Sequence, residues 1–456
     1  MNRIEVSEHQ RISRIALASA VGTIIEWYDF FLYGVLAALV LNHAFFPNYS
    51  PFVGTLLSYT TFAIGFIARP VGGVVFGHFG DRIGRKTVLV LTLLIMGVST
   101  ALIGLLPGYS SIGVMAPVLL LFLRILQGIG IGGEWGGAVV MAIEHAPPGK
   151  RSFYGSYPQI GVPAGLMASA GVVAILNQLP ADAFLAWGWR VAFLLSAVLV
   201  VVGLFIRLKI SETPEFTKVK EQGREVAVPV GEMFMSYPRE IIQTLGARFI
   251  EGASFNMFGV FIIAYGVGTL HLSRGFVLNG VIIASGLMIP LIFYFGSMAD
   301  KIGLRRMFGI GSICVGIATA ASFFVMQNYA HQYPYLVWLA IIVPLSLAYP
   351  MVYGPESSLF ATQFDARVRY TGVSFAYQFS GIFASGLTPI IATLLLERGG
   401  GKPWLIVAYM SVVSLISLVS VVTMQIPNPK VEAADGKLQG ARADEPARPG
   451  QAPARL

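Results

Sequence analysis

Long apolar runs dominate this chain of 456 residues and restrict what it can fold into. A helix needs about 20 apolar residues to cross a bilayer. Twelve runs of this kind lie near 15–41, 53–78, 87–106, 115–143, 157–177, 187–208, 241–269, 277–298, 307–327, 333–354, 371–396 and 403–426. Only 12% of the residues are charged, too few to cover a soluble protein of this size. The sequence therefore predicts an all-α membrane protein with twelve transmembrane helices.

Basic residues are distributed unevenly among the loops between these runs. Loops after even-numbered runs contain DRIGRK, PPGKR, the central segment, DKIGLRR and DARVR, whereas loops after odd-numbered runs carry only Arg274, Arg398 and Lys402. Because positive loops stay on the cytoplasmic side, both termini are expected in the cytoplasm, with the chain crossing a bacterial inner (plasma) membrane many times. Clusters this short do not form the basic face that a nucleic acid would require. The small-residue stretch ALASA precedes the first run, so no cleavable signal peptide is predicted.

A repeat divides the chain into two halves. GHFGDRIGRK begins at Gly77 and GSMADKIGLRR begins at Gly296, about half of the membrane-embedded chain later, and each follows the second apolar run of its half. Such a repeat indicates a duplicated six-helix unit. We expect a cytoplasmic N-terminal tail at 1–14, an N-terminal six-helix bundle at 15–208 and a cytoplasmic linker at 209–240. A C-terminal six-helix bundle at 241–426 and a disordered cytoplasmic tail at 427–456 follow.

The first loop has the form G-x-x-x-D-R-x-G-R-K, and on this motif the chain resembles the major facilitator superfamily. The stretches EWYDFFLYG, FIARPVGGVVFGHFGDRIGRK, RILQGIGIGGEWGGA, WGWRVAFL with SETPEF, and RYTGVSFAYQ resemble its metabolite:proton symporter branch, the shikimate, 2-oxoglutarate, citrate and proline-betaine type. The resemblance implies two pseudo-symmetric bundles that rock about a central site, driven by protons, with no cofactor. The second copy departs from the motif at Leu304. Separately, GVPAG at 161–165 is not a full match to the antiporter signature of the superfamily, and this favours symport.

Glu26 and Asp29 lie inside the first apolar run, where an ionised carboxylate is costly. At a rise of about 1.5 Å per residue, Asp29 lies roughly 18 Å from the cytoplasmic side and Arg124 about 12 Å from the outer side. The two therefore lie at similar depth and are expected to be partners. We predict that Asp29 or Glu26 carries the proton and that Arg124 takes a substrate carboxylate. The alternative is a permanent salt bridge that sets only helix packing.

Further polar side chains are expected to line the substrate site. By helical spacing, Tyr33 shares a stripe with Asp29, and Gln127 and Glu134 share one with Arg124. The candidate substrate-binding residues are Arg124, Gln127, Tyr33, Arg248, Glu251, Asn256, Tyr377 and Gln378. For Arg248 and Glu251, mutual pairing is the alternative, and for Tyr377 and Gln378 it is packing. Arg69, which precedes Pro70, is either structural or in contact with substrate, and Trp27 and Trp135 either line the cavity or pack.

The two loop copies are predicted to form a gate. An acid at a helix end beside two glycines suits a contact with a neighbouring helix terminus that breaks when the cytoplasmic side opens. The candidate gating residues are Gly77, Asp81, Arg82, Gly84, Arg85, Lys86, Asp300, Lys301 and Arg305. The alternative is that these charges serve topology alone.

Several chemistries are not expected. The histidines are scattered without metal-ligand spacing, Cys314 is the only cysteine, and Pro403 after Lys402 breaks any nucleotide-binding loop. We therefore predict no metal, no cofactor and no enzyme activity. The expected protein is a proton-coupled symporter that imports a small organic acid anion and functions as a monomer in the lipid bilayer. The alternatives are an importer of a zwitterionic osmolyte such as proline or betaine, an exporter, and a non-transporting membrane sensor.

Overall fold

The computed structural model describes residues 21–83, 85–132, 149–209, 230–364 and 369–425, with single residues such as Trp135 between 132 and 149. For residues 77–83 and 85–89 it describes the backbone only. The predicted tails at 1–14 and 427–456, most of the predicted linker, Gly84 and Glu134 lie outside the described residues.

The described part of the N-terminal half consists of helices joined by short turns and loops. Its elements are Val21–Leu36, η1 (Ala37–Leu41), α2 (Asn42–Phe45), α3 (Pro51–Ile83), α4 (Arg85–Leu105), α5 (Tyr109–Ile112), α6 (Met115–Ile131), α8 (Arg151–Gln159), α9 (Gly161–Leu176), α10 (Ala181–Ala183), η2 (Phe184–Gly188) and α11 (Trp189–Lys209). The symbol η denotes a π-helical turn. The first helix bends by 48° where it meets the helical segment that ends at Phe45.

The C-terminal half repeats this pattern. Its elements are α13 (Val230–Ser236), α14 (Pro238–Asn256), η3 (Met257–Phe261), α15 (Ile262–Ala264), η4 (Tyr265–Thr269), α16 (Arg274–Ile302), α17 (Leu304–Tyr329), α18 (Tyr335–Ile342), η5 (Val343–Ala348), α19 (Tyr349–Ala361), α20 (Arg369–Gly381), η6 (Ile382–Gly386), α21 (Thr388–Arg398) and α22 (Trp404–Thr423).

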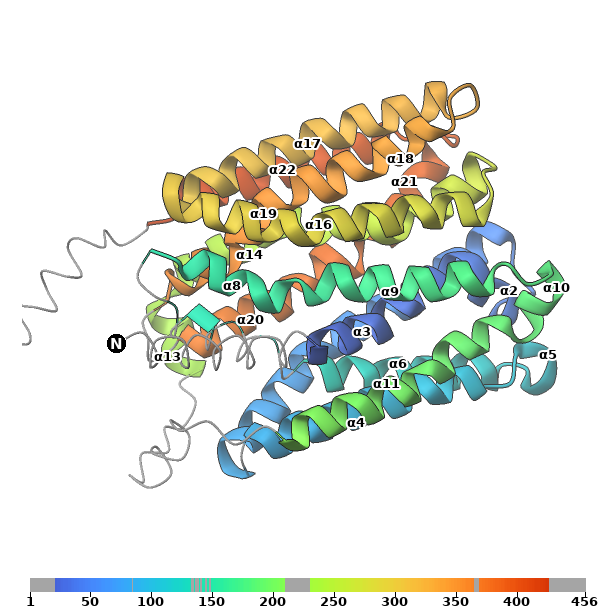
Figure 1. The fold of residues 1–456 in the computed structure, drawn as a ribbon, viewed down its shortest axis with the longest axis horizontal. Helices are drawn as coiled ribbons and strands as arrows, with labels where there is room; N and C mark the ends of the chain where they lie inside the picture. Colours follow the sequence, from blue (N-terminus) through green and yellow to red (C-terminus); the bar gives the residue numbers. More distant parts are fainter. Residues whose placement is uncertain are drawn as a thin grey trace, which may run out of the picture.

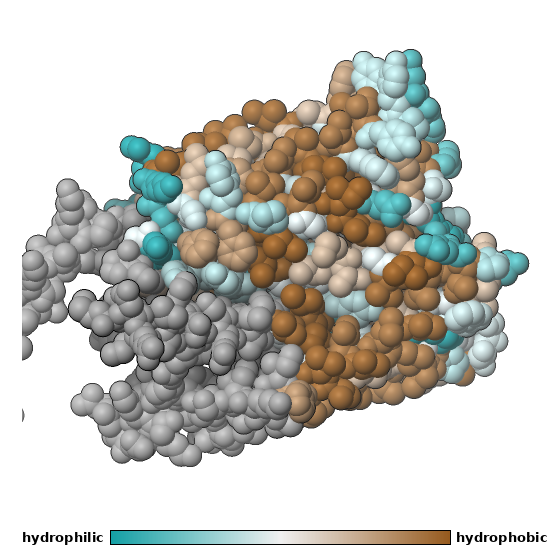
Figure 2. Space-filling model, in the orientation of Figure 1, coloured by the Kyte–Doolittle hydropathy of each residue, from teal (hydrophilic) through white to brown (hydrophobic). Residues whose placement is uncertain are grey.

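Helix length and composition agree with the predicted fold class. In the described ranges nine helices are long and apolar enough to cross a membrane, and the bent first helix makes a tenth. Two shorter apolar helices, Val90–Leu105 and Met115–Ile131, lie in the remaining two predicted runs. On the face shown in Figure 2, apolar side chains form a broad belt between more polar ends, as a membrane-embedded bundle requires.

The two halves lie side by side and are joined along two seams. Figure 1 shows α3, α4, α6 and α11 on one side and α16, α17, α19 and α22 on the other. Along the first seam α8 and α9 pack against α16, and α8 also packs against α19. Along the second, α3 packs against α20, η6 and α21. A central site between the halves would therefore lie between these seams.

Glycines allow α3 and α6 to cross at close range. A Cβ atom on Gly128 would lie 2.2 Å from the carbonyl oxygen of Gly65, and one on Gly72 would lie 2.0 Å from that of Ile129. Only glycine fits at such a crossing, as is common between membrane helices. The crossing brings Arg124 of α6 directly against the backbone of α3.

Candidate functional site

Asp29 lies in the middle of the first helix and is fully buried. Its Oδ1 accepts a hydrogen bond of 2.5 Å from the Ser196 hydroxyl of α11, and the Thr100 side chain of α4 lies beside the same carboxyl group. Its Oδ2 has no hydrogen-bond partner among the described residues. A carboxyl group with one open oxygen in an apolar bundle is a candidate proton carrier.

Arg124 does not pair with Asp29, so the predicted direct partnership is wrong. Arg124 Nη1 donates to Gln127 Oε1 at 2.7 Å, and Arg124 Nη2 donates to the Phe62 carbonyl at 3.2 Å. The guanidinium also lies over the Tyr33 ring, 4.1 Å from its centroid. The prediction considered depth but not the direction of each side chain: Asp29 points toward α11, while Arg124 packs between the first helix and α3.

A chain of polar side chains nevertheless connects the two. Gln127 accepts from Arg124 and donates through Nε2 to the Thr100 hydroxyl at 2.5 Å, and Thr100 lies beside Asp29. Tyr33, which helical spacing puts on the same stripe as Asp29, is hydrogen-bonded to Thr61. A shift of Arg124 would therefore reach Asp29 through two intervening side chains.

Arg69 of α3 is buried with part of its guanidinium group open. Its Nε and Nη2 have no hydrogen-bond partner among the described residues. Its guanidinium carbon lies 4.1 Å from the centroid of Phe30, 4.2 Å from that of Phe66 and 5.0 Å from that of Trp27. Aromatic faces stabilise a buried cation only partly, so open N–H groups here are suited to an anion. The sequence left Arg69 undecided, and the structure favours ligand contact.

Arg69 faces a small enclosed cavity between the halves. Its volume is about 20 Å³, enough for about one water molecule. The lining side chains come from the first helix, α3, α6, α8 and α20, with Trp135: Thr23, Glu26, Trp27, Arg69, Ile131, Trp135, Pro158, Tyr377 and Gln378. Predicted residues from both halves thus meet at one cavity, which is closed in this structure.

Tyr377 and Gln378 of α20 join the halves at this cavity. The Tyr377 ring stacks on Trp135 with centroids 3.4 Å apart, and Gln378 Nε2 donates to the Gly132 carbonyl at 3.1 Å. Both residues therefore contact the end of α6 across the centre of the molecule. Any opening of this seam must break these contacts.

The C-terminal half contains its own buried charged cluster. Arg248 Nη1 lies 2.8 Å from Glu251 Oε2, and Arg248 lies over Tyr377 with its guanidinium carbon 3.6 Å from the ring centroid. The Tyr349 hydroxyl donates to Glu251 Oε1 at 2.7 Å. The pairing of Arg248 with Glu251, which the sequence left open, is therefore present. Asn256 donates to the Gly252 carbonyl within its own helix.

Glu356 of α19 is a buried acid that sequence reasoning missed. It is fully buried, and its Oε1 lies 3.8 Å from Arg248 Nε. The predicted run ended at residue 354, whereas α19 continues to Ala361 and keeps Glu356 inside the bundle. The signal that was available is an acid within one helical turn of a predicted membrane boundary.

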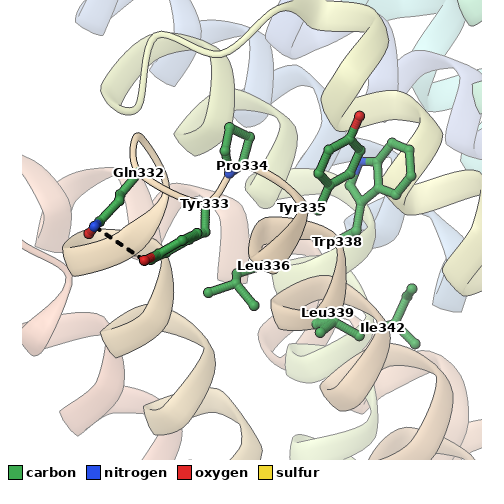
Figure 3. A pocket seen from close by; sticks show the side chains of 8 residues that line it. All are labelled: Gln332, Tyr333, Pro334, Tyr335, Leu336, Trp338, Leu339 and Ile342. Atoms are coloured by element: carbon green, nitrogen blue, oxygen red, sulfur yellow. Dashed lines mark hydrogen bonds between the residues drawn. The ribbon is translucent and has the colours of Figure 1, made fainter.

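A wider, open surface cavity lies elsewhere and does not belong to this site. It has a volume of about 760 Å³ and is lined by Gln332, Tyr333, Pro334, Tyr335, Leu336, Trp338, Leu339 and Ile342. Figure 3 shows these side chains around the start of α18, with aromatic rings at its rim. Tyr333 and Tyr335 are exposed and Trp338 is half-buried. Tyr and Trp at a helix end are typical of a membrane interface, and this open apolar hollow suits lipid.

At the end of the bundle opposite Arg274, Asp300 joins the two halves. Its Oδ1 accepts from the backbone N–H of Ser152 at 3.0 Å, and its Oδ2 accepts from that of Phe153 at 3.1 Å. Both donors lie in the first turn of α8. Arg305 Nη1 donates to the Met424 carbonyl at 3.1 Å, within the C-terminal half. The side chains of Asp81, Arg82, Arg85 and Lys86 lie outside the described residues, as does the side-chain environment of Gly77.

Comparisons with known proteins agree with this architecture. The family model described as the Major Facilitator Superfamily matches residues 19–386. The shikimate transporter of Escherichia coli (strain K12) is 38% identical over 91% of this chain and 95% of its own length. The proline/betaine transporter of the same strain is 31% identical over 96% of this chain and 87% of its own length. Among solved structures, the D-xylose-proton symporter shares the fold, with a TM-score of 0.70 at 18% identity over 90% of this chain and 96% of the other.

Proposed function

Because the chain belongs to the Major Facilitator Superfamily and is therefore a membrane transporter and not an enzyme, we propose that it is a symporter that imports a small organic acid anion together with protons. The observation that carries this proposal is Arg69. A fully buried guanidinium with open N–H groups, facing a cavity between two halves, is stabilised when an anion enters. Because the similar shikimate transporter carries a monocarboxylate, shikimate is the first substrate to test.

Asp29 is the proposed proton carrier. Its buried carboxyl group is tolerated in the apolar interior when it is neutral, and its open Oδ2 can hold the proton. Substrate entry at Arg69 would alter the neighbouring rings of Phe30 and Trp27, and Arg124 lies 4.8 Å from the Phe30 centroid. A movement of Arg124 would reach Asp29 through Gln127 and Thr100. This path offers a physical link between anion binding and proton release.

The transport cycle would open the two seams in turn. We assign the Asp300 end to the cytoplasm, in accord with the basic loops, and the membrane to the bacterial inner membrane. The N-terminal bundle at 15–208 and the C-terminal bundle at 241–426 then rock as units, and the protein acts as a monomer. Asp300 at the first turn of α8 closes the cytoplasmic side. Lys301, Arg305 and the first loop copy, Gly77 to Lys86, are proposed to serve the same gate.

The test is uptake of radiolabelled shikimate into proteoliposomes driven by a pH gradient alone. The wild type should concentrate shikimate. Asp29→Asn should lose uphill uptake, because Asn cannot carry the proton, but should retain exchange of labelled for unlabelled shikimate at equal concentrations on the two sides of the membrane. Asp182→Asn is the matched control, since Asp182 is an exposed acid in α10 of the same half. If Asp29→Asn still concentrates shikimate, Asp29 is not the carrier. Binding without any uptake by the wild type would instead identify a sensor.

A zwitterion importer is the second candidate, because Glu26 lines the same cavity as Arg69. A carboxylate on Arg69 and an ammonium on Glu26 would suit proline or betaine, and the E. coli proline/betaine transporter is a similar protein. Against it, the aromatic faces of Trp27, Phe30 and Phe66 that would attract an ammonium are engaged by Arg69. Competition of shikimate uptake by proline or glycine betaine separates the two candidates.

A further inference from the structure

The Glu356 carboxyl group is buried and receives no hydrogen bond from the part of the chain that the structure describes. It lies in the middle of the C-terminal half, is fully inaccessible to solvent, and neither Oε1 nor Oε2 has a hydrogen-bond partner among the described residues. Its nearest cationic group is Arg248, whose Nε lies 3.8 Å from Oε1. An ionised carboxylate in this position would be one of the most costly groups in the bundle.

Arg248 is already matched by another acid. Its Nη1 forms the shorter contact, 2.8 Å, with Glu251 Oε2, and Glu251 receives a second bond from the Tyr349 hydroxyl. The cluster therefore has two carboxyl groups and one guanidinium, with Arg248 committed to Glu251. One charge is unbalanced unless Glu356 carries a proton.

Arg248 is the one cationic group of the described residues that interacts with Glu356 itself. The titratable groups of the described residues that interact with it are Arg248 and Glu251 from α14, Tyr349 and Tyr353 from α19, and Tyr377 from α20. Arg69 of α3 acts on the cluster through Glu251. Where α8, α16 and α17 meet this part of α19, glycines make close contacts with uncharged residues: Gly155 with Ser357, Gly296 with Gly354, and Gly311 with Met351.

We propose that Glu356 is a second proton-carrying site, separate from Asp29, with Arg248 as its switch. A proton from water on the outer side forms the O–H bond of Glu356 while Arg248 stays on Glu251. When Arg248 moves the short distance onto Glu356, that O–H bond breaks and the proton leaves to cytoplasmic water. The inference rests on the proposed symport and adds its stoichiometry: two protons for one monovalent anion, so that each cycle carries one net positive charge inward.

The test uses wild-type protein in proteoliposomes with shikimate, no pH gradient and an imposed membrane potential, inside negative. One net charge at about 100 mV is worth about 2.3 kcal/mol, which is roughly a fifty-fold accumulation. Wild type should show this stimulation. Glu356→Gln should lose it, because one proton and one anion carry no net charge, while Glu356→Asp should retain it. Glu397→Gln, at an exposed position, is the matched control and should behave as wild type.

Infrared difference spectra of the purified protein, titrated with acid and base, provide a second readout that needs no substrate. Wild type should show the carbonyl bands of two buried protonated carboxyl groups, of which Glu356→Gln loses one and Asp29→Asn loses the other. If Glu356→Gln keeps both bands, or keeps the stimulation by potential, the second site is refuted while the symport proposal stands. If wild type transports no shikimate but the bands behave as expected, the substrate is wrong and the proton site is supported. Replacing sodium with choline should change neither result, and a dependence on sodium would identify Glu356 as a cation site and overturn the proposal.

Discussion

The strongest test of the proposed gate is the substitution Asp300→Asn. Asp300, near the end of α16 in the C-terminal half, accepts two backbone N–H bonds, of 3.0 Å and 3.1 Å, from the first turn of α8 in the N-terminal half. Asparagine keeps one acceptor oxygen and presents an NH₂ group to the other donor. The variant therefore loses one hydrogen bond and the interaction of a negative charge with the helix N-terminus.

The expected magnitude follows from these two losses. A hydrogen bond to a charged group contributes about 1.5–3 kcal/mol, and a carboxylate at a helix N-terminus adds about 0.3–1 kcal/mol. Because Asp300 is partly accessible to solvent, we take about 2 kcal/mol for the whole change, which corresponds to roughly a thirty-fold shift toward the state with the cytoplasmic side open.

The assay is the rate at which a cysteine in this seam reacts with a maleimide. Ser357 is fully buried, and its hydroxyl lies 2.5 Å from where a Cβ atom on Gly155 of α8 would be. In a Cys314→Ser background, Ser357→Cys should label slowly, and adding Asp300→Asn should raise the rate by roughly thirty-fold, because labelling follows the open population. The same background with Asp182→Asn is the control. If Asp300→Asn labels no faster than this control, the contact with α8 does not hold the gate closed.

Two further predictions concern the centre of the molecule. Arg69→Gln should weaken shikimate binding by at least roughly ten-fold, because one charge-assisted hydrogen bond or more is lost. Isothermal titration calorimetry measures the affinity, with Arg398→Gln at the exposed end of α21 as the control. Unchanged affinity of the Arg69 variant would exclude Arg69 from the site. Gly128→Ala should destabilise the fold by about 1–3 kcal/mol and lower the melting temperature, since its Cβ atom would lie 2.2 Å from the Gly65 carbonyl oxygen. The control is Gly171→Ala, which should melt as wild type does because no atom lies within 4 Å of the added Cβ position. Equal melting temperatures of the two variants would contradict the close crossing of α3 and α6.

The fold was predictable because a bilayer leaves the chain few choices. Apolar runs about 20 residues long must become helices, since no water is present to satisfy their backbone groups. The ends of the helices were less certain. Pro355 and Glu356 resemble the end of a run, but α19 continues through both to Ala361. A proline inside a membrane helix is tolerated when neighbouring helices satisfy the freed backbone carbonyl, and this depends on packing that a single run does not reveal.

The sequence offers candidate residues for the site but does not determine which of them contact one another. Depth along a helix follows from residue number, and this is the basis on which the sequence predicts Asp29 and Arg124 near one level. The direction of a side chain depends on how the helix is rotated against its neighbours. Here Asp29 meets Ser196 of α11, while Arg124 meets Gln127 and the backbone of α3. Arg69 was left undecided for the same reason, because its open N–H groups become evident only when every neighbour is in place.

Three fully buried guanidinium groups of the described residues share one feature that bears on how the protein could couple its two halves. Arg69 lies against Phe30, Arg124 against Tyr33 and Arg248 against Tyr377, each with its guanidinium carbon within about 4 Å of a ring centroid. A ring face attracts the cation without specifying a direction in the guanidinium plane, so the N–H groups can exchange one anionic partner for another while the cation remains stabilised. A carboxylate partner alone would hold each arginine in one position. In the proposed cycle, aromatic support on one face and exchangeable partners at the edge would therefore let charge be redistributed between substrate, Asp29 and Glu356 without bringing bulk water into the bundle.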